Sequence, residues 1–117
     1  MERILNEKGE IWLVNLDPTI GAEIKKRRPS LIVNDDAVGV LPLKIIAPIT
    51  DYKDKFQDVP WMVTLIPAQQ NGLEKKSVID LFQVRSVDEK HLVEHKGMIG
   101  VDQLLSVKAA LKVVFVC

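Results

Sequence analysis

Cysteine is almost absent from this sequence: Cys117 is the single thiol and the last of 117 residues, so no disulfide can form within the chain. A lone thiol is consistent with a reducing compartment, and we expect a cytoplasmic protein. Long apolar runs are also missing, because none approaches the roughly 18 residues of a transmembrane span. The first segment, Met1 to Lys8, lacks the apolar core of a signal peptide. These absences predict a soluble protein that does not associate with a membrane.

An excess of one charge is missing as well. Lys and Arg together number 16, as do Asp and Glu, so the formal net charge is zero. This balance argues against a generally basic coat protein for nucleic acid, and any anion-binding site must be a local patch. Such a patch lies at Lys25–Arg28, four consecutive cations between Gly21 and Pro29. A run of this kind is either a solvated loop or an attachment point for a polyanion.

The length and the 47% content of hydrophobic residues predict one packed domain over residues 1–117. Strand-forming residues gather in short runs bounded by turn signals. The first run is mostly apolar on both faces, as in a barrel strand or a covered strand. The third run contains Pro48, which predicts an edge position or a bulge there. The five predicted strands are Glu10–Leu16, Pro29–Asn34, Leu43–Thr50, Trp61–Ile66 and Ser77–Arg85.

The periodicity changes after the fifth strand. Ser86 and Glu89 have the spacing of a capping box, which predicts a short helix to about Lys96, with Gly97 as its terminator. Apolar residues at helical spacing predict a second helix over Gly100–Val116. The predicted fold class is therefore mainly β with α: a small, strongly bent sheet or barrel, partly covered by a C-terminal helix.

Four blocks, in order along nearly the whole chain, carry a more specific pattern. They are Gly9–Glu23 (Gly-Glu-Ile-Trp-Leu-Val-Asn-Leu-Asp-Pro-Thr-Ile-Gly-Ala-Glu), Arg28–Val33 (Arg-Pro-Ser-Leu-Ile-Val), Ala47–Thr50 (Ala-Pro-Ile-Thr) and Ser77–Asp88 (Ser-Val-Ile-Asp-Leu-Phe-Gln-Val-Arg-Ser-Val-Asp). This pattern resembles the MazF/PemK toxins of bacterial toxin–antitoxin pairs. One departure is Asp80, at a position where that family usually has an apolar residue.

The resemblance implies an SH3-like barrel of the CcdB/PemK type, with about five to seven strands and a C-terminal helix, in a homodimer. It implies metal-independent, sequence-specific cleavage of single-stranded RNA, including mRNA, without a cofactor. The 2′-hydroxyl attacks, and the products carry a 2′,3′-cyclic phosphate and a 5′-hydroxyl. The family's catalytic arginine falls on Arg28, its threonine on Thr50 and the acidic residue of its loop on Glu23.

These residue types suit that chemistry. Arg28 is permanently charged and offers a planar fork of donors for the scissile phosphate, and the Thr50 hydroxyl can donate to a phosphoryl oxygen. Glu23 is a candidate base, or a contact to the ribose or the nucleobase. Each also has a structural alternative: a surface ion pair for Arg28, a strand end for Thr50 and a solvated loop position for Glu23. Five further residues are predicted to contact RNA: Lys25, Lys26, Arg27, Gln83 and Arg85. The alternative is solubility alone for the first three, and strand pairing or another structural role for Gln83 and Arg85.

Two other features have competing interpretations. His91 and His95 form a His-x-x-Glu-His motif whose spacing would place both imidazoles on one side of a helix. No convincing third ligand accompanies them, so we predict a solvated helix face and no metal site. Trp12 and Trp61 are interpreted as anchors of the core or of a dimer interface rather than as base-stacking platforms.

The expected partners are single-stranded RNA and a cognate antitoxin whose acidic, flexible segment blocks the RNA site. A groove that holds phosphate also suits an acidic peptide, because both are anionic. Two alternatives remain: a non-catalytic binding module on the same barrel, and a toxin of the same fold directed at DNA gyrase. The Arg28 and Thr50 motifs favour the ribonuclease.

Overall fold

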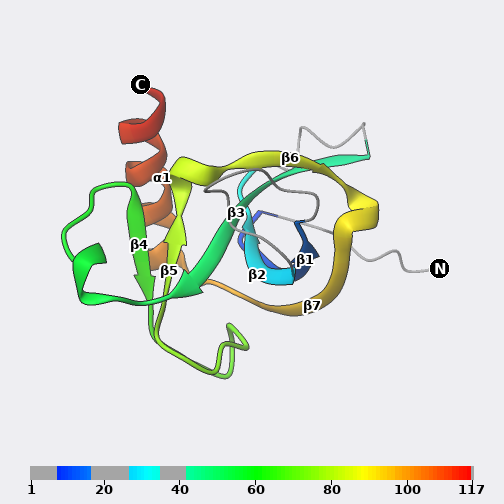
Figure 1. Cartoon of the computed structure of the whole chain (residues 1–117), viewed down its shortest axis with the longest axis horizontal. Helices are drawn as coiled ribbons and strands as arrows, with labels where there is room; N and C mark the ends of the chain where they lie inside the picture. The colour runs from blue at the N-terminus through cyan, green and yellow to red at the C-terminus, as the bar shows by residue number, and fades with distance from the viewer. Residues whose placement is uncertain (1–7, 17–26, 35–41, 117) are drawn as a thin grey trace.

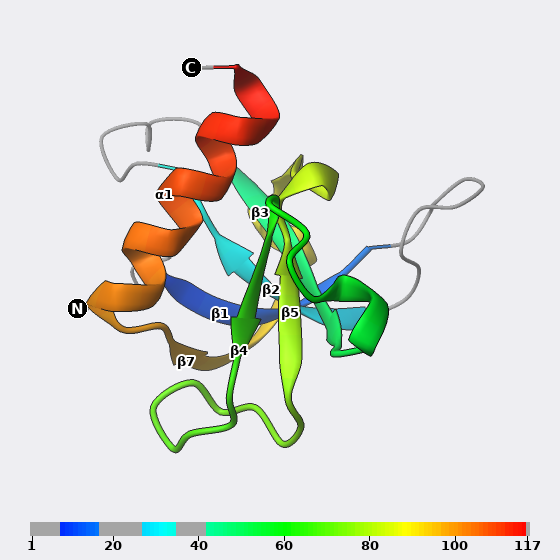
Figure 2. The same cartoon turned by 90° about the vertical axis from the view of Figure 1, so that its left-hand side faces the viewer.

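The computed structural model describes residues 8–16, 27–34 and 42–116. The described residues form seven strands and one α-helix, with three short 3₁₀ turns between strands (Figures 1 and 2). The strands are β1 (Glu10–Asn15), β2 (Arg27–Ile32), β3 (Leu43–Asp51), β4 (Met62–Leu65), β5 (Ser77–Asp80), β6 (Arg85–Asp88) and β7 (Leu92–Met98). The turns are η1 (Asp54–Phe56), η2 (Leu81–Gln83) and η3 (Glu89–His91), and the helix is α1 (Val101–Phe115).

All strand pairs are antiparallel, in the order β4-β5-β3-β2-β1-β7, and β6 also pairs with β3. The sheet bends strongly but does not close on itself, since its end strands β4 and β7 are not paired with each other (Figure 1). The mainly β fold class with a C-terminal helix, predicted from the sequence, is confirmed.

Strand β3 organises the sheet because it contacts three other strands. One edge pairs with β2, while the other pairs first with β6, along Leu43–Ile46, and then with β5, along Ile49–Asp51. Pro48 lies between these two stretches, where the second edge changes partner. The predicted edge position is wrong, because β3 is paired along both edges; since proline has no N–H to donate, it fits at the point where one edge changes partner.

Apolar side chains cover both faces of the sheet, as expected for the first strand. Ile11 and Leu31 belong to the larger core cluster, which α1 closes with Val107 and Ala110. The second cluster lies on the other face, and its members are Trp12, Val14, Leu16, Ile32, Ile46 and Val87. Helix α1 packs against β4 and η2, so it covers one end of the sheet (Figure 2).

The predicted single strand over Ser77–Arg85 is wrong, and Asp80 explains the break. Its Oδ1 accepts a hydrogen bond from the Phe82 N–H at 3.0 Å, so the side chain caps η2 and ends β5. The chain then resumes as β6, which pairs with a different part of β3. Asp80 therefore lies at a turn that the strand-like composition of Ser77–Arg85 does not indicate.

The predicted short helix from Ser86 to Lys96 is also wrong, because this segment forms β6, η3 and β7. Asp88 rather than Ser86 caps the turn, accepting from the Lys90 N–H at 2.9 Å. Pairing of β7 with β1 then outweighs the local helical signal. Gly97 terminates no helix: it lies inside β7, where a Cβ would collide with the Gln70 carbonyl oxygen. The C-terminal helix is confirmed.

Candidate active site

Strand register brings the two principal candidate residues together. β2 and β3 pair with Ile32 opposite Ile46 and Ser30 opposite Pro48. The hydrogen-bonded pairing ends there, and continuing its register by two residues aligns Arg28 with Thr50. Because side chains alternate along a strand, Arg28 and Thr50 lie on the same face of the sheet. The two residues are separated by a turn region in the sequence, whereas the fold carries them on adjacent strands.

Both side chains remain accessible. Arg28 and Thr50 are half-buried, and β2 is most exposed at Arg27, the residue before the candidate arginine. Arg28 is fixed through the backbone, since it lies opposite Val14 of β1 and its carbonyl accepts from the Ser30 hydroxyl at 3.3 Å. The guanidinium makes no hydrogen bond or ion pair to any residue within 8–16, 27–34 and 42–116. Its charge is thus available to a ligand as far as these segments are concerned.

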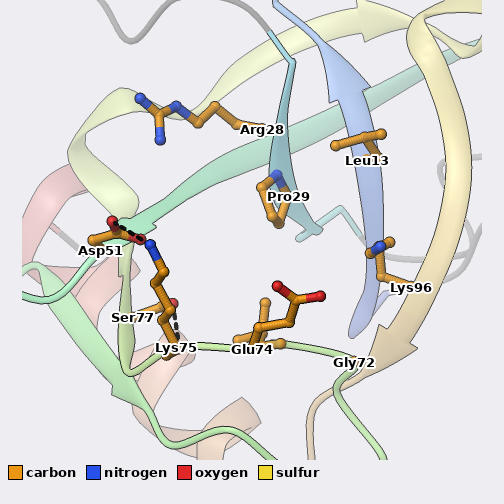
Figure 3. A pocket seen from close by; sticks show the side chains of 10 residues that line it. Leu13, Arg28, Pro29, Asp51, Gly72, Glu74, Lys75, Ser77 and Lys96 are labelled. Atoms are coloured by element: carbon orange, nitrogen blue, oxygen red, sulfur yellow. Dashed lines mark hydrogen bonds and ion pairs between the residues drawn. The ribbon is translucent and has the colours of Figure 1, made fainter.

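A groove of about 370 Å³ adjoins Arg28 (Figure 3). Leu13 and Pro29, which pair across β1 and β2, provide its apolar side. Its charged and polar side chains come from several elements: Arg28, Asp51, Glu74, Lys75, Ser77 and Lys96. Thr50 does not line the groove, because it faces the other side of β3 from Asp51. Arg28 is therefore a residue of the groove as well as of the sheet face that carries Thr50.

The groove combines both signs of charge. Lys75 Nζ lies 3.9 Å from Asp51 Oδ2, and both side chains are well exposed, so water screens this ion pair. Figure 3 shows Arg28 above that pair and Lys96 on the other side of the groove. The sequence analysis missed these lining residues. Asp51 directly follows Thr50, which was a usable signal, whereas the wrong helix prediction concealed Lys96.

The residues predicted to contact RNA lie in different surroundings. Arg27 is exposed at the start of β2, opposite Asn15. Arg85 lies on β6 opposite Ile46, and its Nη1 donates to the Leu16 carbonyl at 3.3 Å. This bond gives Arg85 a structural task, since it fixes the chain directly after β1. Three predicted residues, Glu23, Lys25 and Lys26, lie outside the described residues.

Gln83 belongs to η2 and is tied to Asp80. Its Nε2 donates to Asp80 Oδ2 at 3.0 Å, and the Asp80 side chain is buried, with 6% of the residue exposed. Asp80 aligns with Pro48 when the β3–β5 register is continued from Thr50 opposite Val78. Gln83 is therefore held at the side of the sheet where Arg28 and Thr50 lie.

The two histidines do not share a helix face, which corrects that prediction. His91 closes η3, and its Nδ1 lies 3.0 Å from the Asn15 carbonyl oxygen. His95 is on β7, where its ring meets Trp12 edge-on and its Nε2 lies 3.8 Å from Glu10 Oε2. Within the described segments, no group of three potential His, Cys, Asp or Glu ligands could hold a metal ion.

Helix α1 has 15 residues, and none of the described helices has the length and apolarity to cross a bilayer. Trp12 is buried in the second core cluster, as the sequence interpretation required. Trp61 is half-buried at the start of β4, beside an exposed phenylalanine.

The antiparallel fold agrees with comparison to known proteins. The family model described as "PemK-like, MazF-like toxin of type II toxin-antitoxin system" matches residues 7–115. The chain belongs to this family of toxins.

Individual relatives agree with that assignment. The endoribonuclease MazF of Staphylococcus epidermidis is 34% identical over 107 residues, which cover 91% of this chain and 88% of the relative. The crystal structure of MazF from Deinococcus radiodurans (form I) is 27% identical and superposes with a TM-score of 0.80, covering 98% of this chain and 100% of the other. A MazE–MazF structure from the same organism (form III) is 26% identical, with a TM-score of 0.72 and coverage of 96% and 97%.

Proposed function

We propose that this protein is the toxin of a type II toxin–antitoxin system and acts as an endoribonuclease on single-stranded RNA, including mRNA, in the cytoplasm. The single observation that supports this most is the β2–β3 register, which, continued by two residues, aligns Arg28 with Thr50 on one face of the sheet. Family membership and a relative named as an endoribonuclease support the same activity.

The proposed reaction needs no metal ion or cofactor. The 2′-oxygen of a nucleotide attacks the adjacent phosphorus and loses its proton, while the 5′-oxygen of the next nucleotide leaves and gains one. The products carry a 2′,3′-cyclic phosphate and a 5′-hydroxyl. Arg28 binds the phosphoryl oxygens and stabilises the charge that develops on them, and it can also donate to the leaving oxygen. The Thr50 hydroxyl donates to a second phosphoryl oxygen.

Glu23 is proposed as the acidic residue of the site, on the strength of its place in the family's loop motif. It acts as the base that removes the 2′-proton, or it contacts the ribose or base. Lys25, Lys26 and Arg27 attract the RNA backbone, and this attraction weakens with salt. Gln83 of η2 and Arg85 of β6 are proposed to contact neighbouring nucleotides.

The proposed protein partner is a cognate antitoxin. An acidic, flexible segment of that antitoxin would occupy the cationic surface around Arg28 and exclude RNA by competition. We further propose that the toxin is a homodimer. A related structure from Deinococcus radiodurans contains MazE together with MazF, which supports a protein partner of this kind.

The decisive experiment incubates the purified protein with single-stranded RNA in excess EDTA and determines the end groups. Fragments with 2′,3′-cyclic phosphate and 5′-hydroxyl ends are expected, at short recurring sequences. Arg28→Ala should abolish cleavage, and Arg27→Ala, which removes the neighbouring exposed cation, should reduce it only modestly. If no RNA is cleaved, the non-catalytic binding module and the gyrase-directed toxin become the better hypotheses.

A further inference from the structure

A large aromatic side chain is exposed on the turn after β5. Phe82 has 69% of its surface exposed, although burying a phenylalanine is strongly favourable. Its ring lies beside that of Trp61, with 5.9 Å between the centroids and 53° between the planes. Two aromatic rings thus form one surface patch, the Trp61–Phe82 patch, of which Phe82 is the outer member.

The backbone holds Phe82 in this outward position. The Phe82 N–H donates to Asp80 Oδ1 and the Gln83 amide donates to Asp80 Oδ2, both at 3.0 Å. Leu81, the residue before Phe82, is fully buried, and its N–H donates to the Trp61 carbonyl at 3.0 Å. The turn is therefore anchored on both sides of Phe82, and the exposed ring is presented by a rigid support.

The patch lies close to the candidate active site. Thr50 pairs with Val78 across β3 and β5, and continuing the β2–β3 pairing two residues beyond Ser30 and Pro48 places Arg28 in the same row. Asp80 is two residues along β5 from that row. In a regular sheet, with strand spacings of about 4.8 Å and a rise of about 3.3 Å per residue, this offset corresponds to about 12 Å between the Arg28 and Asp80 backbones. A nucleotide near the scissile phosphate can reach this distance.

We propose that the Trp61–Phe82 patch is a stacking platform for one unpaired nucleobase of the RNA substrate, with the Gln83 amide beside it for the base edge. This inference rests on the proposed ribonuclease function, and it revises the interpretation of Trp61 as a packing anchor. Single-stranded RNA is commonly bound by stacking of bases on aromatic side chains. A polar amide next to an exposed ring suits a base, which has an apolar face and a hydrogen-bonding edge.

The platform makes a quantitative prediction. Stacking of a base on an aromatic side chain contributes about 1–3 kcal/mol, so Phe82→Ala should weaken RNA binding by roughly 5- to 150-fold. Phe82→Trp should retain or strengthen binding, because it keeps an aromatic face. Since Phe82 is mostly exposed, neither change should lower the thermal midpoint appreciably. Ile66→Ala is the matched control: Ile66 is 62% exposed and apolar, but lies beyond the end of β4 and lines a different groove from Arg28.

The test first maps the RNA sequence that the wild-type protein cleaves and then uses its 2′-O-methyl analogue, which cannot react. Its dissociation constant is measured for the wild type, Phe82→Ala, Phe82→Trp and Ile66→Ala. Tryptophan fluorescence is recorded in the same titrations. Since Trp12 is buried, stacking at the patch should quench the Trp61 signal, and Trp61→Phe should remove that response.

The outcomes separate the two proposals. If the wild type neither cleaves nor binds RNA, the ribonuclease function itself is overturned. If the wild type cleaves and Phe82→Ala binds as tightly as Ile66→Ala, only the platform is overturned. If Phe82→Ala changes the molecular mass of the assembly in solution but leaves RNA affinity unchanged, the patch is a protein contact, and the stacking platform is rejected. Weaker binding by Phe82→Ala, rescue by Phe82→Trp and quenching of Trp61 together support the platform.

Discussion

Asp80 offers a sharp test of how the β5–β6 connection is stabilised. The carboxylate is buried and accepts one hydrogen bond from the Phe82 N–H and another from the Gln83 amide, each at 3.0 Å. Replacement by alanine removes both bonds. A hydrogen bond to a charged group contributes about 1.5–3 kcal/mol to stability. Two effects reduce the stability lost with these bonds. The variant avoids the cost of burying a carboxylate, and because Phe82 is exposed, water can hydrogen-bond to its N–H.

We therefore expect Asp80→Ala to lower the free energy of unfolding by about 2 kcal/mol. Asp80→Asn keeps an oxygen that accepts from the Phe82 N–H, but its NH2 group faces the Gln83 amide donor, so that bond is lost. The free energy of unfolding should fall by about 1 kcal/mol. Urea unfolding followed by circular dichroism measures both, at one fixed protein concentration because dimerisation would contribute. For a chain of this length, 2 kcal/mol corresponds to a fall of roughly 8 °C in Tm.

The matched control is Asp88→Ala. Asp88 caps η3 as Asp80 caps η2, but it makes a single exposed bond to the Lys90 N–H at 2.9 Å. Its loss should cost only about 0.5 kcal/mol, at the lower end of the range for caps. Equal losses for Asp80→Ala and Asp88→Ala would refute the reasoning, since burial and the second hydrogen bond would then have no effect.

Three further changes test other parts of the account. Gly72→Ala should destabilise by about 2 kcal/mol or more in urea unfolding, because Gly72 has a φ of +69° and a Cβ would collide with the Lys96 carbonyl oxygen. Lys44→Met should leave stability unchanged or raise it slightly in the same assay. The buried Lys44 ammonium makes a long ion pair of 3.7 Å with Glu89, and without this partner the more exposed Glu89 carboxylate can be hydrated. Thr50→Val should slow RNA cleavage about 100-fold with an unchanged Tm, since it removes one donor from a half-buried position.

Most of β2 and β3 could be predicted because their sequences are locally consistent, but the predicted second strand began at Pro29, whereas pairing with β1 extends β2 back to Arg27 and so includes Arg28. Their runs are rich in β-branched residues and are bounded by proline and charged turns. Their pairing could not be derived from these patterns. The register between β2 and β3 depends on which residues are buried on each face, and this is a property of the assembled sheet. The resemblance to a family supplied the pair instead.

The segment from Ser77 to Met98 shows where sequence patterns fail. The buried Asp80 looks like an isolated polar residue in a strand, yet its carboxylate ends β5 by capping η2. The Ser86–Glu89 spacing resembles a helix start, but β7 is fixed by pairing with β1, far away in sequence. Local signals cannot report such long-range pairing. Because a helix was predicted there, Lys96 was not recognised as a residue that lines the groove, and the two histidines were assigned to a helix.

The basic run between β1 and β2 illustrates the limit of charge as a predictor. Arg27 and Arg28 are adjacent cations in the sequence, but β2 places Arg28 opposite Val14 and in register with Thr50, while Arg27 is the most exposed residue of the strand. Position on the sheet, rather than charge, therefore distinguishes the candidate catalytic arginine from its neighbour.

The most direct test of the central claim is single-turnover cleavage of the mapped RNA by Arg28→Ala, Thr50→Val and the double variant, in EDTA. If both side chains act on one phosphoryl group, Arg28→Ala should lose about 100- to 1000-fold or more in rate. The double variant should then be little slower than Arg28→Ala alone, because groups that act as a unit are not additive. A folded Arg28→Ala protein that cleaves at the wild-type rate would contradict the account.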